Sequence, residues 1–298
     1  MKFDICLMNP PYGSKNQHTS PHLHLQFVES TLNITNKLVA VFPNRIAFSS
    51  SKEYDNFKKV FDDRLEEIEE IDSNVFTGTV MPNVGIFKFS EKRNNNITII
   101  PLVGAAEEVS SLFDKGNKFN SYEDNIFNLC KTDEPNFNPF RPLGKDKNEN
   151  LSEYCDKYIS KRWKDNNVFL ITNLANGGMN GTFISSAVGQ ICKNKNELKS
   201  LMLKRRGACC TIMSFKSIKA ANNCKTALQN NVLRFLLYRL QDDQSMTKRV
   251  YVCVPNIDWS DDRVKTDEGL LQVCGCPADK AKEYAEYCKK IIEKVDNK

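Results

Sequence analysis

The start of the chain constrains the fold most, because an apolar run there meets two consecutive prolines. Residues 3–8 (FDICLM) are followed at once by Asn9, Pro10, Pro11 and Tyr12. The run predicts a short buried strand, which the prolines must end because proline donates no hydrogen bond to a neighbouring strand. Each proline also fixes its own φ angle and restricts the residue before it. The pattern predicts a rigid, extended turn at the carboxyl end of a strand, where open α/β sheets bind ligands.

The first hundred residues alternate between strand and helix patterns. Apolar residues at helical spacing predict a helix over residues 23–32, and serine caps before an amphipathic pattern predict another over residues 49–65. Alternation of strands with helices is typical of an α/β layer. Strands are expected at residues 37–42, at 83–89 and at 97–103, with residues 65–72 forming either a short strand or the end of a helix.

The rest of the chain has a different character. Residues 104–150 are polar and rich in Asn, Asp and Lys, which predicts a connector or a partly ordered extension. From residue 151 onward, short β-like runs alternate with glycine turns and are followed by helical patterns. We therefore expect an α/β domain over residues 1–103, the connector over 104–150, and an α+β domain over 151–298. The helical patterns cover residues 196–204, 220–241 and 279–294.

Composition excludes several classes of protein. With 298 residues, of which 40% are hydrophobic and 27% charged, the chain is typical of a soluble globular protein that has two domains or one domain with a large insertion. No apolar stretch approaches the roughly 20 residues that span a membrane, and the first residues lack the pattern of a signal peptide. We expect a cytoplasmic protein with no membrane partner. A net charge of +5 permits an anionic partner without requiring one.

Cysteine and histidine residues indicate no metal site. The eleven cysteines include no pair of C-x2-C spacings, so we expect reduced, mostly packed thiols rather than a zinc ribbon. The three histidines, His18, His22 and His24, lie close together in the sequence without an obvious acidic partner. We expect them on the surface of a loop and a helix start, and we predict no bound metal.

Residues 3–13 (FDICLMNPPYG) resemble the strand and the catalytic Asn-Pro-Pro-Tyr motif of the adenine-specific DNA methyltransferases, in the gamma order found in type II and type IIG restriction–modification systems. Residues 22–48 are similar to the helix and the proline-ended strand that follow this motif in the family. Further similar segments, in the expected order, are residues 71–89, 214–240, 249–260 and 267–292. The resemblance implies a partial Rossmann-like methyltransferase sheet followed by an α+β target-recognition domain that reads DNA.

The resemblance also implies roles for single residues. The side-chain oxygen of Asn9 and the carbonyl of Pro10 would accept the two hydrogens of the exocyclic amine of an extruded adenine, and Pro11 would help to fix their direction. Tyr12 would stack on the extruded base, with Phe76 as a second aromatic contact. Basic residues near the recognition segment would contact DNA phosphates, although the usual meaning of such a run is a solvated charged face. These residues are Lys204, Arg205, Arg206, Lys216 and Lys219.

S-Adenosylmethionine is the cofactor that the resemblance implies, but the motifs that would hold it are not found in the sequence. In the arrangement that the chain resembles, a glycine-rich loop and an acidic residue precede the Asn-Pro-Pro-Tyr motif, and only eight residues precede it here. We therefore expect an incomplete cofactor pocket. Either a separate chain supplies that half, or the chain is a truncated remnant of such an enzyme. An open sheet edge at the first strand would favour a partner chain.

We expect a site-specific DNA adenine N6-methyltransferase that transfers a methyl group from S-adenosylmethionine to a flipped adenine in double-stranded DNA. Two alternatives stay open. A non-catalytic DNA-binding or specificity subunit would bind DNA without the cofactor. A methyltransferase of protein glutamine or of RNA bases would use the same motif on another substrate, although the segment that resembles a recognition domain speaks against it.

Overall fold

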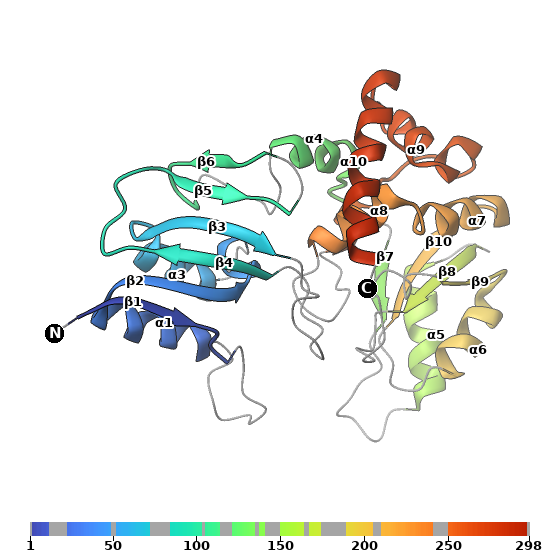
Figure 1. Ribbon diagram of the computed structural model, residues 1–298. Coiled ribbons are helices and arrows are strands. Elements are labelled where there is room, and N and C mark those ends of the chain that lie inside the picture. Colours follow the sequence, from blue (N-terminus) through green and yellow to red (C-terminus); the bar gives the residue numbers. More distant parts are fainter. Residues whose placement is uncertain are drawn as a thin grey trace. The chain divides into compact units, whose positions relative to one another are not determined.

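The computed structural model of the chain describes residues 2–11, 23–48, 52–71, 84–102, 105–113, 121–134, 137–140, 150–163, 167–173, 189–204, 210–240 and 250–296. Contacts divide the chain into two compact units, residues 1–124 and residues 125–297 (Figure 1). None of the helices in the described ranges combines the length and the apolar character that a membrane crossing needs.

A mixed sheet of six strands forms the first unit in its described residues. The strands are β1 (Phe3–Met8), β2 (Thr35–Pro43), β3 (Leu65–Ile71), β4 (Val84–Phe89), β5 (Ile97–Ile100) and β6 (Glu107–Val109). Their order across the sheet is β1-β2-β4-β3-β5-β6 (Figure 1). β1 is parallel to β2 and β3 is parallel to β5, whereas β4 lies antiparallel between β2 and β3. Strands β1, β2, β3 and β5 therefore point the same way, and their carboxyl ends meet at one edge.

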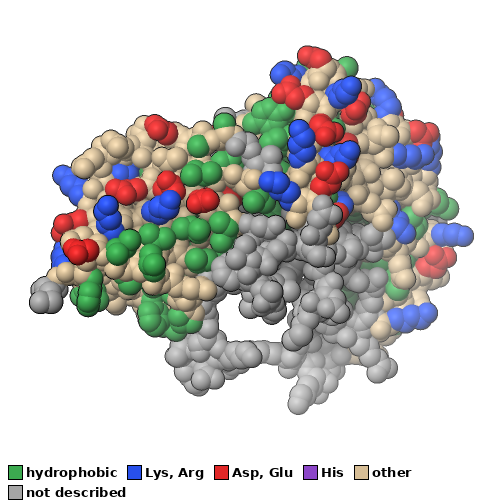
Figure 2. Space-filling view, in the orientation of Figure 1, with side chains coloured by type: hydrophobic (Ala, Val, Ile, Leu, Met, Phe, Trp, Pro, Cys, Tyr) green, Lys and Arg blue, Asp and Glu red, His purple; other side chains and the backbone are tan. Residues whose placement is uncertain are grey.

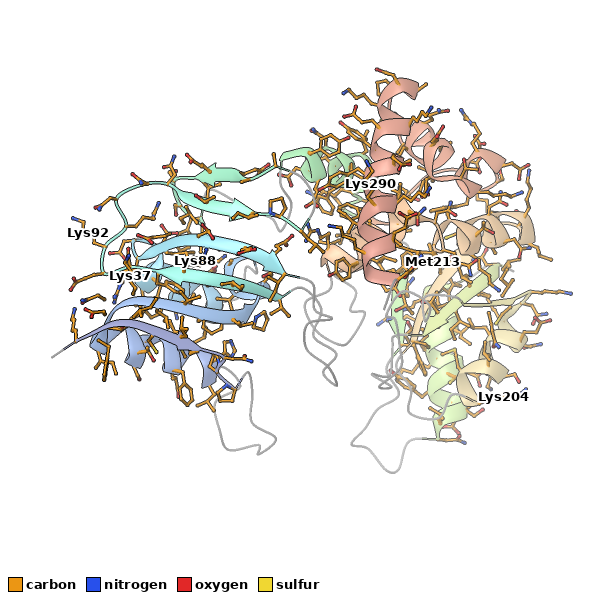
Figure 3. The ribbon with its side chains drawn as sticks, in the orientation of Figure 1. Lys37, Lys88, Lys92, Lys204, Met213 and Lys290 are labelled. Carbon is orange, nitrogen blue, oxygen red and sulfur yellow. The ribbon has the colours of Figure 1, made fainter. Side chains whose placement is uncertain are left out.

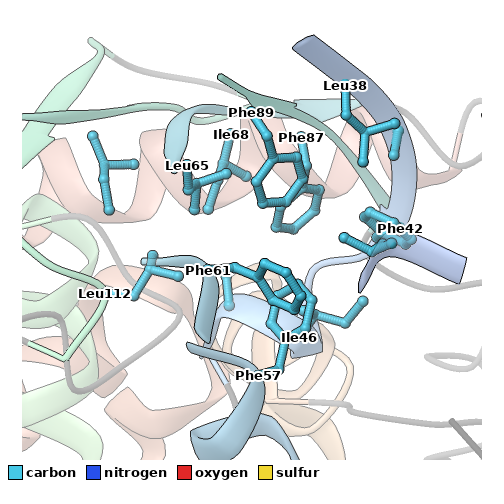
Figure 4. Packing of buried hydrophobic residues seen from close by; sticks show 14 of the residues in the cluster. Leu38, Phe42, Ile46, Phe57, Phe61, Leu65, Ile68, Phe87, Phe89 and Leu112 are labelled. Carbon is cyan, nitrogen blue, oxygen red and sulfur yellow. The ribbon is translucent and has the colours of Figure 1, made fainter. Parts of the chain in front are cut away.

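Three helices share one hydrophobic core with this sheet: α1 (Leu23–Ile34), α2 (Arg45–Phe48) and α3 (Lys52–Phe61). Alternation along the strands turns Phe42 of β2 and Phe87 and Phe89 of β4 towards the helices, and Phe57 and Phe61 of α3 meet them (Figure 4). The rings of Phe42 and Phe87 pack edge to face with centroids 5.5 Å apart. The expected strands and helices of the first hundred residues are thus confirmed, and residues 65–71 are a strand.

The opposite face of the sheet is not covered by these three helices. Residues paired in the register share a face, so Ile5 lies beside Lys37, and Leu7 lies beside Val39, which pairs onward with Lys88. Figure 2 shows hydrophobic side chains gathered on this face over β1, β2 and β4, with charged side chains over β3. We call it the open face.

The prediction that the first strand is buried is wrong. β1 is an edge strand with β2 on one side, and Phe3, Ile5 and Leu7 on the open face are 63%, 55% and 73% exposed. Cys6 and Met8, on the other face, are partly buried against the core. An apolar run predicts a strand, but its burial depends on whether other elements cover both of its faces.

Gly85 of β4 lies where the backbone and a buried side chain approach it closely. A Cβ at this position would lie 2.4 Å from Oδ1 of Asn44 and 3.1 Å from the carbonyl oxygen of Glu69. We expect Gly85→Ala to lower the free energy of unfolding by about 1–3 kcal/mol, because the strand pairing leaves little room for a shift. Urea unfolding followed by circular dichroism measures the loss. Lys92→Ala, in an exposed turn of the same unit (Figure 3), is the control and should stay within about 0.5 kcal/mol of the parent.

An antiparallel sheet of four strands forms the centre of the second unit in its described residues. The strands are β7 (Phe137–Phe140), β8 (Val168–Asn173), β9 (Gln190–Cys192) and β10 (Cys210–Phe215), in the order β7-β10-β8-β9. Helices α5 (Leu151–Arg162) and α6 (Lys195–Lys204) share one core cluster with Phe169, Ile171 and Ile212 of this sheet. Cys224 of helix α7 (Ile218–Ala227) contacts Met213 of β10, which alternates onto the other face. The sheet is therefore covered on both faces.

The remaining helices extend the second unit. They are α4 (Ser121–Cys130), α8 (Asn231–Leu240), η3 (Val250–Cys253), η4 (Asp262–Lys265), α9 (Asp267–Val273) and α10 (Ala278–Asp296). α8 packs on α10, where the Phe235 and Tyr287 rings meet at 6.0 Å and Arg234 pairs with Asp296 at 2.5 Å. The helical patterns expected at residues 196–204, 220–241 and 279–294 are confirmed, the second of them as α7 and α8 separated by a turn.

Residues 104–150, expected as a connector, contain three regular elements in their described parts: β6, α4 and β7. β7 pairs with β10 and so belongs to the sheet of the second unit. Ile126, Phe127 and Phe137 are buried, although Asn, Asp and Lys surround them in the sequence. Such short elements depend on distant partners, which a polar local composition does not reveal.

Tyr251 of η3 anchors the second unit through both its ring and its hydroxyl. The side chain is fully buried, its ring stacks on Phe137 at 4.2 Å, and its hydroxyl lies 3.1 Å from Oγ1 of Thr172. Burial raises the pKa of the Tyr251 phenol to about 12. The folded state thus holds this proton more tightly than an unfolded chain, in which the pKa is about 10.

The high pKa of Tyr251 predicts a loss of stability at alkaline pH. Below about pH 10 both states keep the proton; above it the unfolded state loses the proton first, so unfolding becomes easier as the pH rises towards 12. At pH 8 we expect Tyr251→Phe to be about 1 kcal/mol less stable than the parent. Between pH 8 and pH 11 the free energy of unfolding of the parent should fall by about 1 kcal/mol more than that of Tyr251→Phe. Urea unfolding of both at pH 8, 10 and 11 measures this; a constant difference would contradict it.

Candidate functional site

The rigid turn predicted at the start of the chain lies at the carboxyl end of the edge strand β1. β1 ends at Met8, which pairs with Ala40 of β2. After it, Asn9 and Pro11 are exposed and Pro10 is buried. Pro10 is therefore the residue of this segment that packs into the unit, whereas Asn9 lies at its surface. Tyr12 and Phe76, the two expected stacking residues, lie outside the described residues.

A network of hydrogen bonds joins the neighbouring strand ends at this edge. Asn44 directly follows β2 and is 2% exposed, and its Nδ2 donates to Oε1 of Glu70 in β3 at 3.1 Å. The backbone N–H of Leu102, just beyond β5, donates to Oε2 of Glu70 at 3.0 Å. Both oxygens of the Glu70 carboxylate are thus engaged in holding three strand ends together. Sequence reasoning missed this network. The one local signal for it was Asn44, a polar residue that directly follows the strand-ending Pro43.

Asn9 is exposed and directly follows Met8, the last residue of β1. An exposed amide on a proline-stiffened turn offers a fixed hydrogen-bond acceptor and donor to a ligand. The described part of the site is therefore an exposed amide residue at the end of β1, with the exposed apolar residues Phe3, Ile5 and Leu7 on the same strand.

A hollow lies on the charged part of the open face, over strands β3, β4, β5 and β6. It has a volume of about 860 Å³ and is lined by Glu67, Lys88, Arg93, Thr98 and Glu108, among others. Lys88 pairs with Glu67 at 2.5 Å, and this hydrogen bond raises the pKa of the Lys88 ammonium (Figure 3). Because oppositely charged groups line the hollow, it favours neither an anionic nor a cationic ligand.

The basic residues proposed for DNA contact that the structure describes lie on different elements of the second unit. Lys204 ends α6, before β10 begins, whereas Lys216 is exposed directly after β10 and Lys219 lies in the first turn of α7. Arg205 and Arg206 lie outside the described residues.

Carboxylates compensate part of the charge near α7. Nζ of Lys219 lies 2.9 Å from Oδ2 of Asp262, and Nζ of Lys265 lies 2.7 Å from its other oxygen. Hydrogen bonds from Lys265 and Lys219 hold the pKa of the Asp262 carboxyl well below its usual range. Of the described basic candidates, Lys204 and Lys216 are thus better suited to meet a phosphate than Lys219.

Cysteine and histidine residues were also placed by the structure. No disulfide joins the ten cysteines that the structure describes, and eight of them are buried.

His24 lies fully buried in α1, with its ring centroid 6.2 Å from that of Phe42, so its expected surface position is wrong. His18 and His22 lie outside the described residues. In the described ranges, no group of three or more His, Cys, Asp or Glu side chains is arranged to hold a metal ion.

Fold and site together define an α/β unit whose edge strand β1 is followed by Asn9, Pro10 and Pro11, and a second unit built on an antiparallel sheet. No family model matches this chain, and no curated protein matches it.

Individual solved structures with some similarity come from restriction–modification systems. They include the M protein of the type I restriction enzyme EcoKI (TM-score 0.29, 15% identity, covering 34% of this chain and 25% of that one). A modification subunit of a candidate type I restriction enzyme from Vibrio vulnificus has TM-score 0.29 and 16% identity, covering 37% of this chain and 27% of that one. The type IIG restriction endonuclease BpuSI has TM-score 0.33 and 11% identity, covering 91% of this chain and 49% of that one. The chain spans about a quarter to a half of the length of these proteins, and the scores are too low to establish a shared fold.

Proposed function

We propose that the chain is the target-binding part of an S-adenosylmethionine-dependent methyltransferase that acts on the N6 amine of adenine in double-stranded DNA, within a restriction–modification system. One observation carries the proposal: Asn9, exposed and followed by two prolines, lies at the carboxyl end of a strand that runs parallel to its neighbour. Ligands bind at this edge in open α/β sheets, and the motif is the one that the resemblance assigns to adenine methylation.

Methylation of the adenine amine requires few groups besides hydrogen-bond acceptors that are fixed in place. The Asn9 side-chain oxygen and the Pro10 carbonyl oxygen would each accept a hydrogen bond from one N–H of the amine. These two bonds would orient the lone pair of the nitrogen towards the methyl donor. Positive charge that develops on the nitrogen would be stabilised by these two dipoles, so that no strong base is needed. Tyr12 and Phe76 would stack on the extruded base.

The described residues do not fit S-adenosylmethionine. Its ribose needs a carboxylate acceptor and its methionine part needs a glycine-rich turn at a strand end. The strand-end carboxylate in place here, Glu70, already accepts from Asn44 and from Leu102, and no glycine-rich turn is found beside β1 in the described ranges. We therefore assign the described residues at this edge to the target base and not to the methyl donor.

In the second unit, Lys204 and Lys216 would contact phosphates on DNA. Phosphate contacts place a protein on the duplex without reading its sequence. Arg205, Arg206 and Lys219 complete the proposed basic set. Replacing Lys216 with glutamine should weaken binding to all duplexes by a similar factor and reduce the dependence of affinity on salt.

Calorimetry of the purified chain with S-adenosylmethionine, first alone and then with duplex DNA added, tests the proposal. We expect DNA to bind and the cofactor not to bind to the chain by itself. Methylation is then assayed with the complete assembly by mass spectrometry of the adenines. Methylation of protein or of RNA, with no affinity for DNA, would contradict the proposal.

A non-catalytic DNA-binding or specificity subunit is the second candidate, and the engaged Glu70 carboxylate favours it. Such a subunit would bind duplex DNA as tightly with Asn9→Ala as without it. It would also support no methylation of adenine in any assembly that contains it.

A further inference from the structure

Cysteine side chains gather among the helices of the second unit. Cys130 ends α4, Cys253 ends η3, Cys274 directly follows α9, and Cys288 lies in α10. Cys130, Cys253 and Cys288 are fully buried, whereas Cys274 is partly exposed. All four lie in the second unit, away from the strand ends of the first sheet, so the function proposed above makes no use of their thiols.

The backbone restrains Cys274 at the end of α9. The N–H of Cys276 donates to the carbonyl oxygen of Leu271 at 2.9 Å. The N–H of Gly275 donates to the carbonyl oxygen of Gln272, also at 2.9 Å. With Gly275 at a φ of 94°, these two bonds form the left-handed cap that commonly ends an α-helix. Cys274 is the residue on which this cap closes, so its backbone is fixed while its side chain keeps contact with water.

Cys130 lies beside this segment at the end of α4. The N–H of Thr132, two residues later, donates to the carbonyl oxygen of Val252 in η3 at 2.8 Å and so ties the end of α4 to η3. A hollow of about 390 Å³ is lined by Leu129 of α4 together with Cys276 and other residues from the start of α10. The neighbours of Cys130 and Cys274 therefore share one hollow, which leaves room for a small solute beside the two cysteines.

The thiols of Cys130 and Cys274 hydrogen-bond to each other, with Cys130 as the donor. This bond holds the pKa of the Cys274 thiol below its usual range. The same bond, together with burial, raises the pKa of the Cys130 thiol. Because the thiolate is the nucleophilic form of cysteine, Cys274 is the member of the pair that reacts first, and Cys130 is in place to react with its product.

We propose that Cys130 and Cys274 are a modification site, at which hydrogen peroxide converts the two thiols into a reversible disulfide. The Cys274 thiolate attacks one oxygen of the peroxide and the O–O bond breaks, which gives a sulfenic acid. The hydroxide that leaves takes up the proton that Cys274 released. The sulfur of Cys130 then attacks the sulfur of this acid, and the S–O bond breaks, so that the oxygen leaves as water with the proton of Cys130. The two thiols lose two electrons in all, which reduce the peroxide to two molecules of water.

The disulfide fastens the end of α4 to the end of α9, although the two cysteines lie far apart in the sequence. A crosslink that closes so long a loop strongly restricts the unfolded chain. The second unit of the oxidised protein should therefore unfold at a temperature about 5 °C or more above that of the reduced protein. Scanning calorimetry before and after oxidation measures this difference, and addition of dithiothreitol should reverse it.

Peptide mapping of the whole purified chain tests the site. The reduced protein is treated with hydrogen peroxide, its remaining thiols are blocked with N-ethylmaleimide, and its peptides are analysed without reduction. We expect a crosslinked pair of peptides that contain Cys130 and Cys274, about 2 Da lighter than the two reduced peptides together. Cys274→Ser should abolish this pair. The matched control is Cys6→Ser, at the other partly exposed position within the described ranges, which should leave the pair unchanged.

The contrary results are equally specific. No crosslinked pair, a pair of Cys274 with Cys253 or Cys288, or a disulfide between two copies of the chain would each overturn the inference. The experiment needs neither DNA nor S-adenosylmethionine, so its outcome is independent of the proposed function.

Two substitutions of Cys130 separate its two roles. Cys130→Ser keeps a hydrogen-bond donor but forms no disulfide, so a sulfenic acid should accumulate at Cys274 and react with dimedone. Cys130→Ala also removes the donor, and should slow the alkylation of Cys274 by iodoacetamide at pH 7 by about threefold or more relative to Cys130→Ser. Circular dichroism establishes first that both variants fold. Equal alkylation rates in the two variants would overturn the assignment of Cys274 as the attacking thiol.

Discussion

Replacing Asn9 with alanine should lower the rate of adenine methylation by about 10²–10³-fold. The substitution removes the side-chain oxygen that would hold one N–H of the target amine, and the Pro10 carbonyl alone would leave the amine free to rotate. Single-turnover kinetics of the complete, methylation-competent assembly measure the rate. Asn9 is exposed, so the thermal unfolding temperature should stay unchanged.

Two comparisons make this result specific. Asn9→Asp keeps an oxygen acceptor, and the resembled motif admits Asp at this position, so this variant should retain far more activity than Asn9→Ala. DNA affinity should change less than about twofold for either variant, since the phosphate contacts that we propose lie in the second unit. An unchanged methylation rate with Asn9→Ala would show that Asn9 is not part of the site. A loss of DNA affinity as large as the loss of rate would show that Asn9 is a general DNA contact.

Phe87→Ala should lower the free energy of unfolding of the first unit by about 3–5 kcal/mol. Phe87 is fully buried in the middle of β4, where its ring meets Phe42 at 5.5 Å and Phe89 at 6.5 Å (Figure 4). Removing the ring loses its transfer free energy and leaves a cavity between β2, β4 and the helices. The loss is comparable with the whole stability of many domains, so the unit should be partly unfolded at 37 °C.

Hydrogen exchange of the β2 and β4 amides measures this loss in the first unit without interference from the second. Phe113→Ala is the matched control: it removes the same ring from a position that is 46% exposed, and should cost about 1 kcal/mol or less. Equal losses of protection from the two variants would contradict the placement of Phe87 at the centre of the core.

Local sequence determined much of the backbone of this protein. The apolar run at residues 3–8 and the prolines after it define a strand and a stiff turn by themselves, because proline restricts φ without help from tertiary contacts. Helical spacing likewise predicted α1, α3, α6 and α10. Residues 65–72 read equally well as a strand or as a helix end, and only pairing with β4 and β5 decided for the strand.

Tertiary structure alone decided what these elements face. An apolar run looks the same in a central strand and at an edge, so the exposure of Phe3, Ile5 and Leu7 followed only from the strand order. The joining of Asn44 to Glu70 brings together residues 26 positions apart, and the burial of His24 depends on a neighbour from another element. Backbone preference is set by adjacent residues, whereas burial and hydrogen-bond partners are set by distant ones. For this reason the strand that leads to Asn9 was predictable and the open face beside it was not.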